Sequence, residues 1–306
     1  MSTSEVVLLR QKEDTFGQRF LESELWAVLK RLLRNPKGAF GTGVLALLVA
    51  MAVLGPRIVP YDPIELHLED KLGPPSAEYW FGTDELGRDI FSRIVSGAAV
   101  SLQAGLLAVS LAGVIGALTG LLAGYLGGGI DAVIMRIWDT VLAFPSVFLA
   151  IGIVTILGPE RINAVIAVAA ISMPTFARLV RAQTLCVKAA DFVVAARAIG
   201  CSDRRIMFRT ILPNCITPMV VNMAIAAPGA ILVEAALSYL GMGSQPPDPS
   251  WGNMLQAAQQ YLRRSSTYGV FPGVAITLVV LGMSFFADGL QDALDPRRIH
   301  AAAKVA

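Results

Sequence analysis

Residues able to do covalent or metal chemistry are few in this sequence and do not gather into a site. The two histidines, His67 and His300, and the three cysteines lie far apart, with no CxxC or HExxH spacing. No GxSxG is present, and the glycine cluster GYLGGG at 124–129 lacks the Lys-Ser or Lys-Thr that completes a phosphate-binding loop. We therefore expect no metal site, no disulfide framework and no ATP hydrolysis by this chain itself, and an intramembrane enzyme is only a remote alternative.

Two acidic residues lie in strongly apolar segments, where a charge is costly. Asp139 follows Arg136 by three residues, so the two side chains are expected to meet on one helix face. Glu234 is expected near the external end of another apolar segment. Each is either a contact of a transport pathway or a structural hydrogen bond between helices. Because no relay of acids runs through these segments, a proton-driven pump is weakly supported.

The segment AARAIGCSDRRIMFRTILPN, residues 195–214, is basic and punctuated although long apolar runs flank it. We expect a first helix over Asp191–Ile199. Gly200 can end this helix in the left-handed conformation, which is unfavourable for residues that carry a Cβ. The segment is either a basic loop that sets topology or a rigid knob on which a cytoplasmic protein docks.

A second short helix is expected directly after this glycine. Ser202 is a suitable N-cap, and Asp203 in the first turn suits the positive end of the helix dipole. The Leu212-Pro213 pair is expected to return the chain to the membrane. The candidate site residues are Ala195, Ala196, Gly200, Ser202, Asp203, Arg204, Arg205, Arg209, Leu212 and Pro213.

The elements that must position these residues are apolar helices. The sequence is 55% hydrophobic and 16% charged, with a mean hydropathy of +0.61, whereas soluble domains carry roughly 25% charged residues. A net charge of +2 gives no support for a nucleic-acid partner. We expect an all-α membrane protein with six transmembrane helices, since six segments are long enough to span a bilayer: 39–59, 98–125, 132–157, 163–184, 215–240 and 268–290.

The distribution of Lys and Arg predicts the orientation. These residues gather in 1–38, in 178–209 and in the C-terminal tail 291–306, which the positive-inside rule places in the cytoplasm together with both termini. No signal peptide is expected, so the first apolar segment should remain as an anchor. Phe20–Gly38 repeats leucines on one face between basic residues, which is typical of a helix lying on a membrane surface.

Small residues and prolines predict how the helices pack. Small side chains recur every four residues on one face of the second span and should be buried against another helix: Ala104, Ala108, Ala112, Gly116, Gly120 and Gly124. Prolines inside later spans predict bends around a cavity: Pro145, Pro174, Pro218 and Pro228. The loops 60–97 and 241–266 are expected outside, with Trp251 as a candidate interfacial anchor.

The cytoplasmic loop, residues 185–213, resembles the signature of ABC-transporter permeases, which reads E-A-A, three residues, Gly, nine residues, I-x-L-P. Two positions depart from it, because Val194 replaces the usual glutamate and Thr210 the usual isoleucine. The matching residues are Ala195, Ala196, Gly200, Leu212 and Pro213.

Further stretches are similar to the C-type permease subunit of the peptide/nickel branch of this family. They are Phe81–Leu102, Ala236–Leu255, Phe271–Arg298 and the N-terminal run Lys30–Phe40, which together cover nearly the whole chain in order. The first stretch holds an external motif of glycines and polar residues: Gly82, Thr83, Asp84, Gly87, Arg88 and Asp89.

The resemblance implies a type I ABC importer permease. Its five-helix core is 98–290, with the first span 39–59 at the periphery and a coupling helix in the 185–213 loop. The implied partners are a second permease subunit, two cytoplasmic ATPase subunits or domains that use ATP and Mg, and an extracytoplasmic substrate-binding protein, in a bacterial cytoplasmic membrane. This chain would bind no cofactor. The implied cargo is di- or oligopeptides, with nickel or another small solute as the alternative and an ion-driven transporter as a remote one.

Overall fold

The computed structural model describes residues 26–294, and in this range the chain is helical apart from its loops and one isolated bridge between Thr83 and Asp89. Residues 26–34 are helical as well, whereas the remainder of the expected surface helix, Phe20 to Leu25, lies outside the described residues, as does most of the tail. The long helices are α2 (Pro36–Ile58), α3 (Ile90–Leu126), α6 (Arg161–Lys188), α9 (Leu212–Tyr239) and α11 (Ser266–Leu294). The shorter ones are η1 (Leu68–Asp70), α4 (Gly128–Leu142), α5 (Ser146–Leu157), α7 (Asp191–Ala198), α8 (Asp203–Arg205), η2 (Ile206–Ile211) and α10 (Trp251–Ala258).

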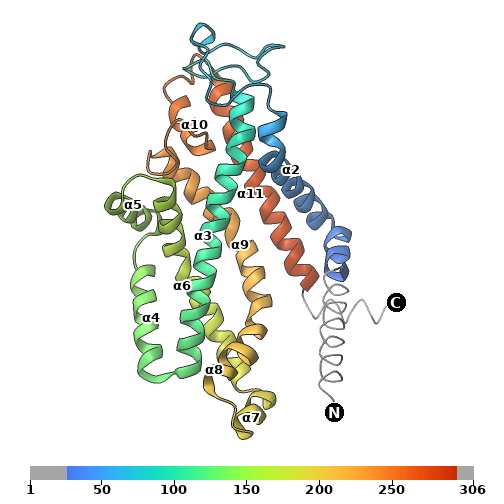
Figure 1. The fold of residues 1–306 in the computed structure, drawn as a ribbon, viewed down its shortest axis with the longest axis vertical. Coiled ribbons are helices and arrows are strands. Elements are labelled where there is room, and N and C mark those ends of the chain that lie inside the picture. The colour runs from blue at the N-terminus through green and yellow to red at the C-terminus, as the bar shows by residue number, and fades with distance from the viewer. Residues whose placement is uncertain (1–25, 295–306) are drawn as a thin grey trace, which may run out of the picture.

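The central helix is α3, which packs against α6 and α9, while α2 pairs with α11 (Figure 1). The loops that join α2 to α3 and α9 to α11 gather at the upper end of Figure 1, and α7 and α8 form the lower end. Five helices in the described range are long and apolar enough to cross a membrane, and the bent pair α4–α5 brings the number to six. The chain is therefore a multi-pass, all-helical membrane protein.

The bend expected at Pro145 in the 132–157 segment is confirmed, and it is sharp. The chain forms two helices there, α4 and α5, which meet at 96°. The break falls at Pro145, which precedes Ser146 at the start of α5 and, lacking an N–H, cannot continue the hydrogen-bond ladder of α4. In contrast, α6 runs through Pro174 and α9 runs through Pro218 and Pro228.

The small-residue face of α3 is buried where the helices come closest. A Cβ on Gly116 would lie 2.6 Å from the Phe176 Cβ, and one on Gly120 would lie 2.3 Å from the Ala177 carbonyl oxygen. The two backbones can therefore approach only because these α3 residues have no side chain. All six residues of the face are buried: Ala104, Ala108, Ala112, Gly116, Gly120 and Gly124.

Candidate functional site

The first half of the 185–213 loop is a short helix with a complete C-terminal cap. In α7, the Gly200 amide donates to the Arg197 carbonyl (3.0 Å) and the Cys201 amide donates to the Ala196 carbonyl (3.1 Å). This is the Schellman arrangement, which requires the left-handed conformation that Gly200 adopts with φ = +81°. The expected glycine end of this helix is confirmed, and Ala196 supplies one of the capped carbonyls.

An apolar cluster anchors this loop to the membrane helices. Val193 is 1% exposed and packs with Leu121 of α3, Val180 of α6 and Ile206 of η2. The opposite side of the loop is uncovered, since Phe192, Val194 and Ile199 are 51%, 58% and 80% exposed. The valine that replaces the usual glutamate therefore lies on the outer surface and changes no internal contact of the loop.

The second half of the loop differs from the expectation of a separate short helix. The α8 turn begins at Ser202, whose side chain makes no capping hydrogen bond, and it passes through η2 directly into α9. Residues Asp203–Tyr239 thus form one helical stretch, in which Leu212-Pro213 stands at the start of α9. The η2 segment is a π-helix, in which five-residue spacing brings Ile206 and Ile211 to the same buried face.

Three side chains tie this second half to the ends of α3 and α6. The Tyr125 hydroxyl at the end of α3 donates to Asp203 Oδ1 (2.5 Å). The Lys188 ammonium at the end of α6 donates to the Tyr125 carbonyl (2.5 Å) and lies 5.3 Å from the centre of the Tyr125 ring. Asp203, expected only as a charge at a helix dipole, is thus also a hydrogen-bond partner, and no spacing rule relates it to a residue 78 positions away.

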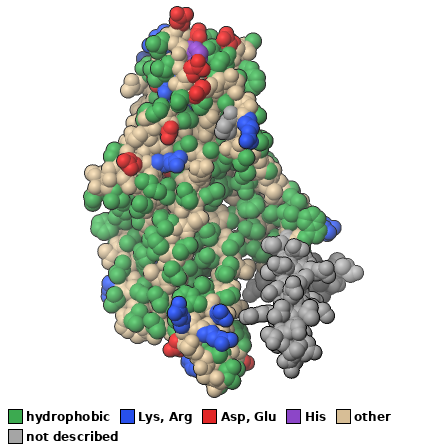
Figure 2. Space-filling model, viewed as in Figure 1, with side chains coloured by type: hydrophobic (Ala, Val, Ile, Leu, Met, Phe, Trp, Pro, Cys, Tyr) green, Lys and Arg blue, Asp and Glu red, His purple; other side chains and the backbone are tan. Residues whose placement is uncertain are grey.

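Arginines line a hollow of about 470 Å³ beside this helix, together with Ser202 and Phe208. Arg204, Arg205 and Arg209 form no ion pair with any carboxylate of residues 26–294. Basic side chains gather at this lower end of the molecule in Figure 2. The hollow therefore offers unpaired positive charge next to the apolar surface of α7.

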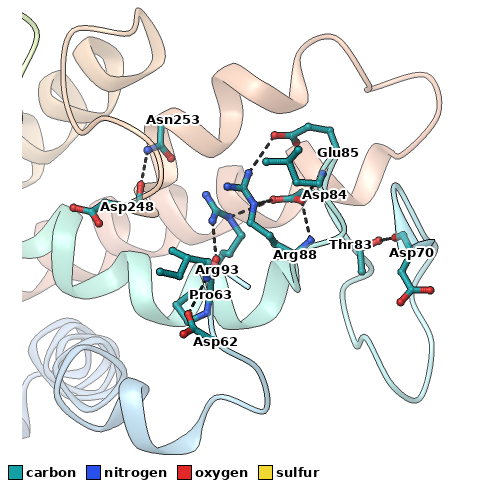
Figure 3. A network of polar contacts seen from close by, with 12 residues as sticks. Asp62, Pro63, Asp70, Thr83, Asp84, Glu85, Arg88, Arg93, Asp248 and Asn253 are labelled. Atoms are coloured by element: carbon teal, nitrogen blue, oxygen red, sulfur yellow. Dashed lines mark hydrogen bonds and ion pairs between the residues drawn. The ribbon is translucent and has the colours of Figure 1, made fainter. Parts of the chain in front are cut away.

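At the opposite end (Figure 1), residues 60–89 form a folded cap, which we name the external cap after the side of the membrane expected for it. The Asp84 carboxylate is fully buried, accepts hydrogen bonds from the Arg88 amide (3.0 Å) and Arg88 Nε (2.6 Å), and lies 3.5 Å from Arg93 Nε (Figure 3). Arg93 on α3 also donates to the Pro63 carbonyl (2.7 Å). Two arginines around one carboxylate thus fasten the external cap to α3.

The remaining residues of the external motif complete this frame. Thr83 accepts from the Gly73 amide (2.8 Å) and donates to the Asp70 carbonyl, and Asp89 caps α3 by accepting from the Ser92 amide (2.9 Å). Gly82 and Gly87 have φ values of +80° and +79°. All four polar motif residues, Thr83, Asp84, Arg88 and Asp89, are buried, so they shape the external cap and are not available for contact from outside.

The second external loop folds onto the same helix. Ser250 and Asn253 form a capping box at the start of α10. Trp251 is 0% exposed and its indole N–H donates to the Ile94 carbonyl of α3 (3.0 Å). The expectation of Trp251 as an interfacial anchor is therefore wrong, because its ring is an internal contact between this loop and α3.

The intramembrane acids have partners that sequence spacing did not reveal. Asp139 pairs with Arg178 of α6 (2.6 Å) and not with Arg136, so that expectation is wrong. Asp131 lies about two turns before Asp139 on α4. It accepts two hydrogen bonds of 2.6 Å from Arg181 of α6. These two ion pairs hold α4 against α6. The sequence feature that could have predicted them is the presence of acidic residues in one apolar segment and basic residues in the next.

Glu234 is buried near the end of α9 and does not face an open cavity. Its Oε1 accepts from the Ser238 hydroxyl (2.7 Å), whose oxygen accepts from the Ser244 amide (3.2 Å). This chain of contacts joins α9 to the second external loop, which favours the structural interpretation of Glu234. Among residues 26–294, no group of three His, Cys, Asp or Glu side chains could hold a metal ion.

Comparison with known proteins agrees with this architecture at both ends of the chain. Residues 116–300 match the family described as the binding-protein-dependent transport system inner membrane component. Residues 23–75 match the N-terminal transmembrane domain of oligopeptide transport permease C.

Curated relatives extend over most of this chain and most of their own length. The dipeptide transport system permease protein DppC of Alkalihalophilus pseudofirmus is 45% identical over 88% of both chains. The di/tripeptide permease DppC of Pseudomonas aeruginosa is 44% identical over 87% of this chain and 90% of its own. The glutathione permease GsiD of Pectobacterium atrosepticum is 42% identical over 90% of both. The chain therefore belongs to the ABC-transporter permease family, as a C-type subunit of the branch that includes the dipeptide permeases.

Proposed function

We propose that this chain forms half of the translocation pathway of an importer for short peptides. The relatives named for dipeptides, di- and tripeptides and glutathione, itself a tripeptide, support this cargo. The second half of the pathway comes from another permease chain, and a substrate-binding protein delivers the peptide to the external cap and the 241–266 loop. The termini and the 185–213 loop lie in the cytoplasm of a bacterial cell.

We further propose that the 185–213 loop is the surface on which a partner ATPase seats. The observation that carries this proposal is the two-sided character of α7, which is anchored by Val193 and leaves Phe192, Val194 and Ile199 exposed. An apolar ridge on a capped helix is suited to insertion into a groove of another protein. The unpaired arginines of the neighbouring hollow supply positive charge at the rim of that contact.

The covalent and hydrogen-bonded connections of this loop would couple a movement of the ATPase to the membrane helices. Because Asp203–Tyr239 is one helical stretch, a rigid movement of the loop is transmitted directly to α9. The hydrogen bonds of Tyr125 and Lys188 carry the same movement to α3 and α6. ATP and Mg act on the partner ATPases, whose closure and opening would switch the permease pair between inward-facing and outward-facing states.

The experiment is reconstitution of this chain in liposomes with its second permease, the ATPases and a peptide-loaded binding protein. We expect ATP-dependent peptide uptake and stimulation of ATP hydrolysis by the loaded binding protein. A mixture without the ATPases should show neither. Uptake at the full rate without ATPase subunits would overturn the coupling proposal.

A further inference from the structure

A pocket of about 240 Å³ opens at the surface of the helical bundle, where α5, α6 and α9 meet. Figure 1 shows α5 at the upper end of α6, beside the break between α4 and α5. Ser146 lines the pocket from α5, Ser172 and Thr175 from α6, and Gly229 from α9. A Cβ added at Gly229 would meet no atom within 4 Å, so this wall is open space and not a packed contact.

The lining of this pocket is mostly apolar and carries no ionisable side chain. Its polar side chains are three hydroxyls. The Ser172 hydroxyl donates to the Val168 carbonyl of its own helix (2.9 Å), whereas those of Ser146 and Thr175 bond to no other described residue. The pocket can therefore offer hydrogen bonds to a neutral polar group without attracting either sign of charge.

A buried amide adds a further polar group along α9. Asn222 precedes the pocket residues Ala226, Gly229 and Val233 at helical spacings of three and four, so it lies on the same face of α9. Its Nδ2 is shielded from solvent and has no hydrogen-bond partner in the described part of the chain. Buried amide donors normally have partners, so a donor left without one is available to a polar group that reaches this face of α9.

Helix irregularities surround the same pocket. Pro145 breaks the α4–α5 pair next to Ser146, Pro174 precedes Thr175 in α6, and Pro228 precedes Gly229 in α9. Pro174 and Pro228 lie inside their helices, where each removes one backbone N–H and so releases a carbonyl. Within a membrane, such backbone is tolerated where it is buried in protein or lines a cavity.

We infer that the α5–α6–α9 pocket is this chain's part of the peptide pathway, and that it recognises the peptide main chain through neutral donors and acceptors. Peptide amides need hydrogen-bond partners when they leave water, and hydroxyl, amide and carbonyl groups supply them. The absence of charge from the lining leaves cargo side chains undiscriminated. This inference rests on the proposed function and names the residues that contact the cargo.

The first test fills the pocket. In the reconstituted transporter, Gly229→Leu should lower peptide uptake at least about tenfold, because a side chain would occupy the passage, and it should leave assembly with the partner subunits unchanged. The matched control is Gly273→Leu in α11, where an added Cβ also meets no atom within 4 Å but which does not line the pocket. We expect that control to transport at the rate of the unmodified chain.

The second test uses a substitution that preserves packing. Thr175→Cys is made in a chain whose Cys186, Cys201 and Cys215 are replaced by serine, and the assembled transporter is treated with a bulky thiol reagent. Uptake should be lost on modification, and excess dialanine should slow the modification. Gly273→Cys treated in the same way should keep its uptake.

The outcomes separate this inference from the proposed function. If the unmodified transporter shows no ATP-dependent peptide uptake, the proposed function fails. If that uptake occurs but Gly229→Leu and the modified Thr175→Cys protein transport normally, only the pathway assignment is overturned. If Gly229→Leu does not assemble, the modified Thr175→Cys protein decides the question, since it is assembled before it is blocked.

Discussion

The left-handed backbone of Gly200 can be tested by a single substitution. Its φ of +81° lets the Cys201 amide reach the Ala196 carbonyl, and no atom would crowd an added Cβ. The constraint is therefore on the backbone and not on space.

We predict that Gly200→Val uncouples the transporter, because a β-branched residue is strained in the left-handed region by about 1–2 kcal/mol. ATP-driven peptide uptake should fall while the spans still insert. Gly200→Asn is the matched control, since asparagine tolerates this conformation, and it should retain most uptake. Equal uptake by the valine and asparagine variants would show that the cap does not matter for coupling.

The ionisation of Tyr79 should limit the stability of the external cap at high pH. Burial, followed by the hydrogen bond that its hydroxyl donates to Asp70 (3.1 Å), raises the pKa of Tyr79 to about 12. The neutral phenol is therefore favoured in the folded state. Its contribution to stability is complete below the unfolded pKa of about 10 and is lost as the pH rises to about 12.

We predict that Tyr79 ionises at a higher pH than an ordinary tyrosine. The difference in ultraviolet absorbance between the unmodified chain and Tyr79→Phe should titrate with a midpoint near 12. Resistance of the external cap to proteolysis should weaken over the same range. A midpoint close to 10, the ordinary value for tyrosine, would contradict the buried position of this side chain.

At the scale of elements, two polar connections hold the ends of the bundle in place. One joins the C-terminal end of α3 and that of α6 to the start of the α8–η2–α9 stretch, and the other joins the external cap to α3. Both are made by side chains far apart in sequence, and each can be broken by replacing one group.

For the cytoplasmic connection, we predict that Tyr125→Phe reduces uptake per ATP hydrolysed. Phenylalanine keeps the buried ring but removes the hydroxyl that binds Asp203. Asp203→Asn keeps an acceptor at this position and should be affected less. The measurement is the ratio of peptide imported to ATP consumed, with Tyr239→Phe as a control outside this connection. An unchanged ratio in Tyr125→Phe would remove Tyr125 from the coupling mechanism.

For the external cap, Asp84→Asn should be strongly destabilising. Removing one charge of a buried pair typically costs about 3–5 kcal/mol, because the partner charge stays buried. Here Arg88 and Arg93 would both lose their shared carboxylate. Glu78→Gln on the exposed surface of the same loop is the control, and thermal unfolding in detergent compares the two. Similar unfolding temperatures would exclude a supporting role for this pair.

Sequence patterns predicted elements better than connections. The helical spacing, the left-handed Gly200 and the small-residue face of α3 all depend on neighbours in the chain, so they could be predicted. The pairing of Asp139 with Arg178 instead of Arg136, the burial of Trp251 and the bond from Tyr125 to Asp203 depend on which helices become neighbours. Pro145 indicated a bend between α4 and α5, but not that the two helices would meet at 96°.

At the scale of the whole molecule, the two polar ends are predicted to face opposite sides of the membrane. The prediction uses single cysteines in a chain whose native cysteines are replaced by serine. Glu78→Cys in the external cap should react with a membrane-impermeant thiol reagent added to intact cells. Ser202→Cys in the 185–213 loop should react only after the membrane is opened. The reverse labelling pattern would invert the proposed orientation.

The π-helical segment η2 also makes chain length a determinant of function. One extra residue in this turn sets the faces before and after it out of phase, since each helical residue turns the chain by about 100°. The start of the stretch is fixed by Asp203, and the pocket face lies further along at Gly229. Deleting a single residue within Ile206–Ile211 would thus rotate the pocket face by more than a quarter turn relative to Asp203.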